Sequence, residues 1–299
     1  MAKIVDSYRF LDSIPKRMMK HWATLGTLRQ IPWSPLAKPL SQCTVSIVSS
    51  AGVALKTDRP FDQQIERRDP WSADPSYRVL PRTTANGDVR VHHLHINTSF
   101  AEQDLNCVLP LDRLNELEAV GEIAHSAPSH YSYMGYTLRP DTLLRHAVLG
   151  IIAQLLREQV DAVLLVPVRP VCCWSVGLVQ REIEAAGFST ISLSMMPELT
   201  RTVGVPRIAA IEHPFGLPLG LPQDVVHQLA VLRATLRALE EISEPGSVVH
   251  LPFEWNSKEE LNLHPPEAPP IARFLRRHPW YVTKFLNRTP PDVSGQAVS

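Results

Sequence analysis

Two adjacent cysteines, Cys172 and Cys173, lie in "DAVLLVPVRPVCCW" (residues 161–174), where an apolar run gives way to a proline-bracketed loop. A helix is expected to begin near Cys172, and the unpaired amide groups and dipole at a helix start favour a thiolate. Arg169 lies three residues earlier and adds a permanent positive charge. Both effects are expected to lower the thiol pKa, so we predict that Cys172 is a nucleophile; the alternative is an inert, buried cysteine. Cys173 is predicted to pack, because a helix turns it about 100° away.

Histidine and tyrosine side chains offer groups for proton transfer or substrate positioning. His93 and His95 in "VHHLHINT" are two residues apart, which would place both on one face of a strand. They could act as a base, as part of a metal site or as ordinary polar neighbours; we expect no metal, because no carboxylate follows at ligand spacing. The loop "SHYSYMGY" adds His130 and Tyr133, which would either line a pocket or cover an edge.

Two further candidate pairs follow predicted strands. Glu212 and His213 in "IEHPFGLPLG" could supply a base and its orienting carboxylate, although neighbours on a strand point to opposite faces. Ser49 and Ser50 close the predicted strand "CTVSIVSS" and are expected to contribute to substrate binding. The sequence contains neither GxGxxG nor GxxxxGK, so no nucleotide cofactor is expected.

The composition narrows the classes of partner. The chain has 299 residues, and the charges of its 30 basic and 30 acidic side chains cancel. No net charge therefore favours binding to nucleic acid or to an anionic membrane. A small-molecule substrate, a partner subunit and a homo-oligomer are expected instead. The apolar runs are shorter than the ~20 residues of a membrane span, and no signal core opens the chain, so a cytoplasmic protein is predicted. Four irregularly spaced cysteines indicate reduced thiols rather than a disulfide framework.

Strand-length apolar runs alternate with segments of helical period along most of the chain, which predicts an α/β fold with mostly parallel sheets. In the second half, the expected strands are "DAVLLVPV", "STISLS" and "RIAAIEHP", and the expected helices are "CCWSVGLVQREIEAAG", "QDVVHQLAVLRATLRALEEI" and "PDTLLRHAVLGIIAQLLREQ", the last with Asp141 as its cap. We expect two Rossmann-like lobes that face each other across an interlobe cleft. The predicted divisions are an N-terminal arm (1–40), a first lobe (41–150), a second lobe (151–250) and a proline-rich tail (251–299). Because sites form beyond the carboxyl ends of parallel strands, the loops 49–52 and 169–172 should meet in the cleft.

The strings that surround these residues are long and unusual. "VDAVLLVPVRPVCCWSVGLVQREIEAAGFSTISLS", "SIVSSAGVAL", "FAEQDLNCVLPLDRLNEL", "HYSYMGY" and "TRTVGVPRIAAIEHPFG" resemble the glycine, sarcosine, betaine and D-proline reductase selenoprotein B family, in its short-chain branch. The resemblance runs to about residue 256. It implies reductive cleavage of a bond alpha to a carbonyl or carboxylate, in which a selenocysteine of a UxxC-like loop attacks carbon and expels an amine. Arg169 occupies the matching selenocysteine position, with Cys172 three residues later.

This departure leaves three functions open. Arginine cannot be the nucleophile, so a reductase or reductase subunit would rely on Cys172, with Arg169 clamping a substrate carboxylate and a thioredoxin-like thiol as reductant. Such an oxidoreductase would cleave a C–N or related bond of a small amine or amino-acid-like substrate. The second hypothesis is a redox-neutral racemase or lyase of the two-lobed α/β type. The third is a homologue that binds a ligand without chemistry.

Overall fold

The fold is built around one large central β-sheet. The computed structural model describes residues 4–26, 29–255 and 261–291. Its main sheet has the strand order β10-β9-β8-β7-β1-β6-β3, and β5 pairs with β1 beside this path. The strand bounds are β1 (Thr44–Ser49), β3 (Tyr77–Pro81), β5 (His125–Ser126), β6 (Ser129–Tyr133), β7 (Ala162–Val166), β8 (Ser189–Ser194), β9 (Arg207–Ala210) and β10 (Ser247–His250).

The sheet is parallel except at β3, which runs antiparallel to β6. The two expected Rossmann-like lobes are not confirmed, because β1 and β7, one from each expected lobe, pair along five consecutive residues at the centre of one sheet. Both strands are almost entirely buried, as expected of central parallel strands that are covered on both faces. The mixed α/β class with a mostly parallel sheet is confirmed, but the loops after β1 and β7 are neighbours at one sheet edge rather than opposite walls of a cleft.

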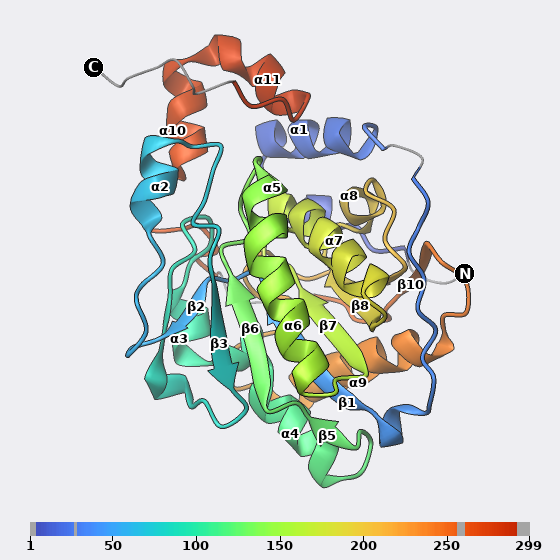
Figure 1. Cartoon of the computed structure of the whole chain (residues 1–299). Helices are drawn as coiled ribbons and strands as arrows, with labels where there is room; N and C mark the ends of the chain where they lie inside the picture. The colour runs from blue at the N-terminus through green and yellow to red at the C-terminus, as the bar shows by residue number, and fades with distance from the viewer. Residues whose placement is uncertain (1–3, 27–28, 256–260, 292–299) are drawn as a thin grey trace.

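Helices cover both faces of the sheet. In Figure 1, α6 (Leu149–Arg157) and α7 (Pro170–Ala185) lie on one face, and α9 (Val225–Glu241) lies on the other with α4 (Leu111–Ala119). Alternate strand residues point to opposite faces and so join different cores. On β1, for example, Val48 packs with the core under α6 and α7, whereas Ile47 packs with the core under α9.

Shorter elements complete the structure. β2 (Val53–Leu55) and β4 (Val89–Val91) form a separate antiparallel pair, and α2 (Gln63–Arg68), α3 (Ser99–Gln103), α5 (Pro140–Thr142) and α8 (Pro197–Arg201) connect the strands. Between α5 and α6 the chain forms a π-helical segment, Leu143–Val148. Among the described residues, short 3-10 segments lie in the loops at Ser7–Phe10, Leu40–Gln42, Asn86–Asp88, Leu105–Cys107 and Pro279–Tyr281. No helix in the described part of the chain is long and apolar enough to cross a membrane.

The segments near the two termini pack together. α1 (Ser13–Ala23), α10 (Pro270–Arg277) and α11 (Val282–Leu286) gather at the top of Figure 1. Trp22 of α1 is fully buried, and its indole N–H donates to the carbonyl of Phe285 at 3.1 Å. The predicted arm therefore contains a helix that shares a core with the predicted tail.

Two local predictions are wrong. The expected strand through "VHHLHI" ends at Val91, so His93 and His95 lie in the loop that follows β4 and not on one face of a strand. Asp141 is not the helix cap, because the helix begins at Pro140 with Arg139 before it. Proline lacks a backbone N–H and is readily accommodated at the first helical position, which moves the start forward.

Candidate active site

Cys172 lies in the first turn of α7, directly after the central strand β7. Pro170 occupies the first helical position and Arg169 the N-cap, so α7 begins two residues before the cysteine pair. Cys172 and Cys173 are both fully buried. The helix sends them to different places, as predicted: Cys172 faces Ser50 and His93, and Cys173 faces Ser194 and the chain after β8.

The imidazole of His93 contacts the sulfur of Cys172. Its Nε2 lies 3.3 Å from Cys172 Sγ, and its Nδ1 accepts a hydrogen bond of 3.1 Å from the backbone N–H of His95. Burial, with the nearby charges of His95 and Arg169, lowers the pKa of His93 well below its ordinary value, so the ring is neutral. A neutral ring that accepts at Nδ1 carries its proton on Nε2. His93 therefore donates a hydrogen bond to the sulfur.

A buried carboxylate positions this histidine loop. Glu66 of α2 is fully buried, and its Oε1 lies 2.6 Å from Nε2 of His95. The His95 ring stacks on Tyr136, with centroids 3.9 Å apart, and Tyr136 donates to the carbonyl of Pro70. These contacts fix the backbone of His95, which in turn fixes the Nδ1 of His93. Glu66 was not predicted as a site residue, because the partner of its carboxylate lies 29 residues away in sequence.

The expected low pKa of Cys172 is wrong. Burial raises the pKa of the Cys172 thiol to about 12, and the adjacent Cys173 adds to the rise. The hydroxyl of Ser50, the guanidinium of Arg169 and the backbone N–H of Val168 all act in the opposite direction. Removal from water penalises the thiolate more than these groups stabilise it. The sulfur is thus a neutral thiol that is surrounded by groups suited to its anion.

Arg169 supplies the positive charge near this thiol. Its guanidinium lies over the ring of Phe215, 5.5 Å from the ring centre, and burial lowers the pKa of Arg169 to about 10. The side chain stays charged at neutral pH. Within the described part of the chain it has no ion pair, although electrostatic attraction to Cys172 and Asp12 favours its charge.

Gly135 and Tyr133 complete the wall around the sulfur. A Cβ added at Gly135 would lie 2.4 Å from Cβ of Ser50 and 3.0 Å from Cys172 Sγ, so only glycine permits this approach. The hydroxyl of Tyr133 is buried beside the side chains of Cys172 and Ser175. Burial, with the nearby Cys172, raises the pKa of Tyr133 well above its ordinary value. Gly135 sits in the tyrosine-rich motif, but its closeness to a cysteine 37 positions later has no local signal.

The remaining predicted residues are placed elsewhere or in supporting contacts. Ser49 donates to the carbonyl of Val108 at 2.8 Å, whereas Ser50 accepts from the N–H of Val168 at 3.1 Å. His130 lies inside the sheet: its Nδ1 accepts from the N–H of Ile47 at 3.0 Å, and burial lowers its pKa to about 3. It supports the sheet.

Glu212 and His213 belong to a different cluster. Arg9 forms an ion pair with Glu212 at 2.9 Å, and the N–H of Asp6 donates to the same carboxylate. His213 lies with Nδ1 3.0 Å from the carbonyl of Pro218 and Nε2 3.1 Å from Nε2 of His227. These contacts differ from those of Cys172, and Glu212 and His213 do not form the base and carboxylate pair that their adjacency suggested.

A cavity of about 220 Å³ adjoins the site. His93, Gln63 and Arg67 line it together with Leu94, Ile96 and several residues of the C-terminal segment, among them Glu267 and Arg273. His93 is thus shared between the cavity and the sulfur of Cys172. Across residues 4–26, 29–255 and 261–291, no group of three or more His, Cys, Asp or Glu side chains is arranged as a metal site.

Comparison with known sequences assigns the family. Residues 11–168 match the model of the family described as glycine/sarcosine/betaine reductase selenoprotein B. The chain belongs to this selenoprotein B family. Its match to D-proline reductase subunit gamma of Acetoanaerobium sticklandii is 33% identical over 226 residues, which cover 76% of this chain and 90% of that protein.

Other relatives in this family are longer. The glycine reductase complex component B subunit gamma of Carboxydothermus hydrogenoformans is 30% identical over 203 residues, 65% of this chain and 44% of that protein. The betaine reductase complex component B subunit beta of Peptoclostridium acidaminophilum is 27% identical over 185 residues, 60% of this chain and 41% of that protein. The matched part of this chain thus spans less than half of these two relatives. No solved structure matches the chain.

Proposed function

We propose that this member of the selenoprotein B family is a subunit of a reductase complex that cleaves a C–N bond in a small amino-acid-like substrate, with Cys172 as the nucleophile. The observation that supports it most is the hydrogen bond from His93 Nε2 to Cys172 Sγ, in a site where Ser50 and Arg169 also favour the thiolate. The relatives named for D-proline, glycine and betaine reduction point to the same class of reaction.

The chemistry starts with the thiolate of Cys172. Its sulfur attacks the carbon that carries the ammonium group, the C–N bond breaks, and the amine departs with the bonding electron pair. A thiolate of a dithiol reductant then attacks Cys172 Sγ, and the carbon leaves with the C–S electron pair and takes a proton. This step leaves a mixed disulfide between the reductant and Cys172. The second thiol of the reductant attacks that disulfide and releases the thiolate of Cys172. The dithiol is oxidised to a disulfide, and its two electrons reduce the carbon.

Substrate binding activates the thiol in this scheme. The pKa of Cys172 is about 12 in the substrate-free site, because the sulfur is out of water. A substrate ammonium next to the sulfur adds an opposite charge, which lowers a thiol pKa. His93 then stabilises the thiolate as a hydrogen-bond donor, and Arg169 as a nearby charge. The sulfur is thereby protected from unwanted oxidation until a cationic substrate is present.

One observation favours a second function. Cys172 is fully buried, and burial raises the pKa of its thiol to about 12. A homologue that binds an amino-acid-like ligand and performs no chemistry would have the same resting state. In that protein, replacement of Cys172 would leave ligand binding intact and have no effect on turnover by the complex.

The two functions separate in one experiment. The tagged chain, purified from its own cells so that partner subunits are retained, is incubated with each substrate and dithiothreitol as reductant. Release of the cleavage product is assayed: the free amine from glycine, sarcosine and betaine, and the ring-opened amino acid from D-proline, whose nitrogen stays on the carbon chain. We expect Cys172→Ser to abolish release and the matched Cys173→Ser to retain most of it. Full activity in Cys172→Ser, or no release by the wild-type preparation from any of the four, would contradict the proposed reductase.

A further inference from the structure

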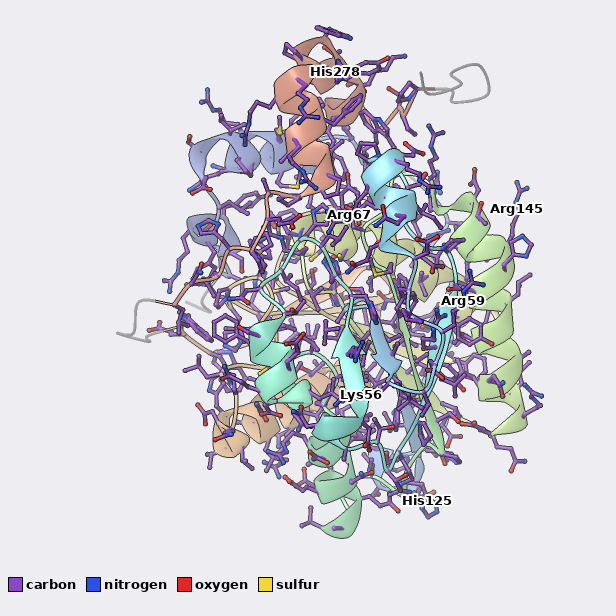
Figure 2. All side chains as sticks on the ribbon, turned by 90° about the vertical axis from the view of Figure 1, so that its left-hand side faces the viewer. Lys56, Arg59, Arg67, His125, Arg145 and His278 are labelled. Carbon is purple, nitrogen blue, oxygen red and sulfur yellow. The ribbon has the colours of Figure 1, made fainter. Side chains whose placement is uncertain are left out.

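The cavity beside His93 contains more positive than negative charge. Arg67 extends into it from α2 and Arg273 from α10, and one carboxylate, that of Glu267, lies with them. Figure 2 shows Arg67 on the face where α2 meets the C-terminal segment. The helix α2 has a second role, because its Glu66 is the buried partner of His95. The helix α2 therefore carries both Arg67, which lines the cavity, and Glu66, which positions the loop of His93 and His95.

Glu267 bridges both arginines through one oxygen. Its Oε2 lies 3.0 Å from a terminal nitrogen of Arg67 and 3.7 Å from a terminal nitrogen of Arg273. The Glu267 side chain is 63% exposed, so the ion pairs are in contact with water and contribute little stability. A carboxylate that enters the cavity can replace that of Glu267 at small cost.

We propose that Arg67 and Arg273 form the binding site for the carboxylate of an amino-acid-like ligand, and that Glu267 occupies this site until the ligand displaces it. The inference rests on the proposed function for the class of ligand: glycine, sarcosine, betaine and D-proline all carry a carboxylate on the carbon next to nitrogen. Guanidinium groups suit carboxylates because their N–H donors match the two oxygens. Arg169, the anchor predicted from sequence, then acts on the sulfur of Cys172 rather than on the carboxylate.

The volume of the cavity and the place of His93 in its wall fit this class of ligand. The cavity of about 220 Å³ lies below the ~300 Å³ at the lower end of pockets for drug-sized molecules, so it suits a ligand of a few heavy atoms. A ligand held by its carboxylate at the arginines directs its nitrogen end toward His93, which also lines the cavity. His93 Nε2 is 3.3 Å from Cys172 Sγ, so the ligand approaches the thiol from the His93 side.

Ligand affinity measured without turnover tests this site. D-Proline and D-prolinamide, which lacks the carboxylate, are titrated into the full chain by calorimetry. We expect binding of D-proline but not of the amide, at least tenfold weaker binding by Arg67→Gln and by Arg273→Gln, and tighter binding by Glu267→Gln because the competing carboxylate is gone. If D-proline does not bind, the same titrations with glycine, sarcosine and betaine decide the matter.

A second cavity provides the matched control. It also measures about 220 Å³ and contains the ion pair of Arg233 with Glu122, which lies between α4 and α9 and includes neither His93 nor Cys172. Arg233→Gln and Glu122→Gln should leave D-proline binding unchanged. Equal affinity in wild type, Arg67→Gln and Arg273→Gln, or no binding of any of the four carboxylates, would overturn the inference. Because binding is measured in the Cys172→Ser background as well, failure of the reductase chemistry alone leaves these affinities unaffected.

Discussion

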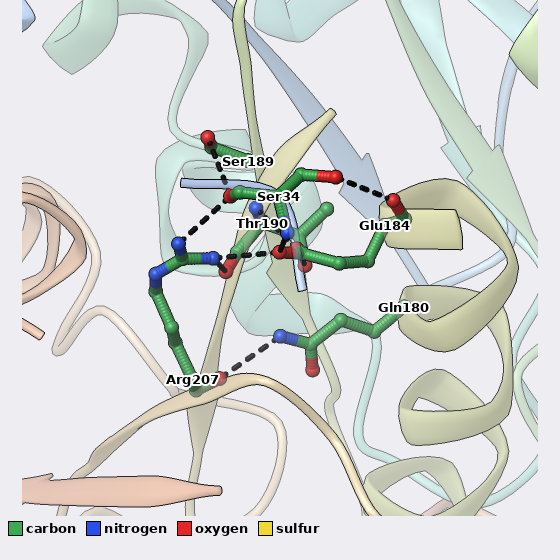
Figure 3. Close-up of polar contacts among 6 residues, drawn as sticks. All are labelled: Ser34, Gln180, Glu184, Ser189, Thr190 and Arg207. Atoms are coloured by element: carbon green, nitrogen blue, oxygen red, sulfur yellow. Dashed lines mark hydrogen bonds and ion pairs between the residues drawn. The ribbon is translucent and has the colours of Figure 1, made fainter. Parts of the chain in front are cut away.

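The helix α7 carries a buried polar cluster near each end, and the two clusters differ in their balance of charge. Near its C-terminal end, the carboxylate of Glu184 accepts hydrogen bonds from the N–H of Ser34, from the N–H and hydroxyl of Thr190, and from the guanidinium of Arg207 (Figure 3). The negative charge is matched by a positive one. Near its N-terminal end, the neutral thiol of Cys172 lies among donors and the charged Arg169.

This difference separates a structural cluster, around Glu184, from the candidate active site around Cys172. The Glu184 cluster joins α7 to β8, β9 and the N-terminal segment, and its charges are already paired. The Cys172 cluster has groups that would stabilise an anion, yet burial keeps the anion from forming. A site of this kind gains electrostatic stabilisation only when charge develops, which is the requirement for catalysis.

The largest effect is expected from breaking the structural cluster. Glu184→Gln leaves Arg207 buried without its counter-charge, so we expect the free energy of unfolding to fall by about 3–5 kcal/mol. Urea denaturation measures the change. The control is Glu122→Gln, whose partner Arg233 is 39% exposed, and there the expected loss is at most about 1 kcal/mol. A similar loss in both variants would contradict the contrast between paired buried charge and surface charge.

A pH effect of comparable size is expected at His130 in the sheet. In the folded protein His130 is neutral, because burial lowers its pKa to about 3 from an ordinary value of 6.5. The unfolded chain therefore takes up a proton first as the pH falls. The stability that His130 contributes is complete above pH 6.5 and is lost between pH 6.5 and 3, by about 1.4 kcal/mol per pH unit.

His130→Gln isolates this contribution, because glutamine keeps a side-chain acceptor but does not titrate. Thermal denaturation from pH 7 to pH 4 should show a smaller loss of stability in the variant than in the wild type. Parallel curves for the two proteins would contradict the assignment of a neutral, buried His130.

A medium effect is expected where the backbone approaches the thiol. Gly135→Ala places a methyl group 2.4 Å from Cβ of Ser50 and 3.0 Å from Cys172 Sγ. We expect a loss of about 1–3 kcal/mol in stability from this crowding, together with loss of turnover. Gly87→Ala is the matched control, because an added Cβ there meets no atom within 4 Å. Equal stability and activity in the two variants would show that Gly135 is not in the wall of the site.

The smallest effect concerns the charge near the sulfur. Arg169→Met removes a group that lowers the pKa of Cys172, so the pKa rises further and alkylation by iodoacetamide at a given alkaline pH slows several-fold. Arg169→Lys keeps the charge and should retain most of the rate. Mass spectrometry of the Cys172 peptide follows the reaction. Faster alkylation in Arg169→Met would contradict the expectation that the charge of Arg169 lowers the pKa of Cys172.

Local patterns were sufficient to predict the main elements of the second half of the chain. The apolar run that became β7, the helical spacing of α7 and α9, and the strands β8 and β9 are all confirmed. The number of sheets was not predictable in this way. Whether β1 pairs with β7 depends on contacts between residues more than 100 positions apart, and a two-lobed and a one-sheet arrangement share the same alternation of elements.

The residues at the centre of the candidate site were predicted from the sequence, and the residues that support them were missed. Cys172, Arg169 and Ser50 were predicted because they follow predicted strands, and His93 because of its spacing from His95. The structure brings these four residues together. Glu66 and Gly135 carry no signal, because their importance arises from long-range packing against His95 and Cys172. The direction of the Cys172 pKa shift was missed for the same reason: a sequence shows a helix start and a nearby arginine but not the loss of water.

Peptide mass spectrometry of the chain after incubation with substrate tests the central claim most directly. The tagged complex is incubated with D-proline, glycine, sarcosine or betaine without reductant, so that the second step cannot occur. Our account predicts that one of these compounds leaves its carbon skeleton attached to Cys172 as a thioether, with Cys173 unmodified, and that dithiothreitol removes the adduct. Turnover with dithiothreitol by a preparation in which none of the four compounds modifies Cys172 in its absence, or attachment to Cys43, Cys107 or Cys173 instead, would contradict it.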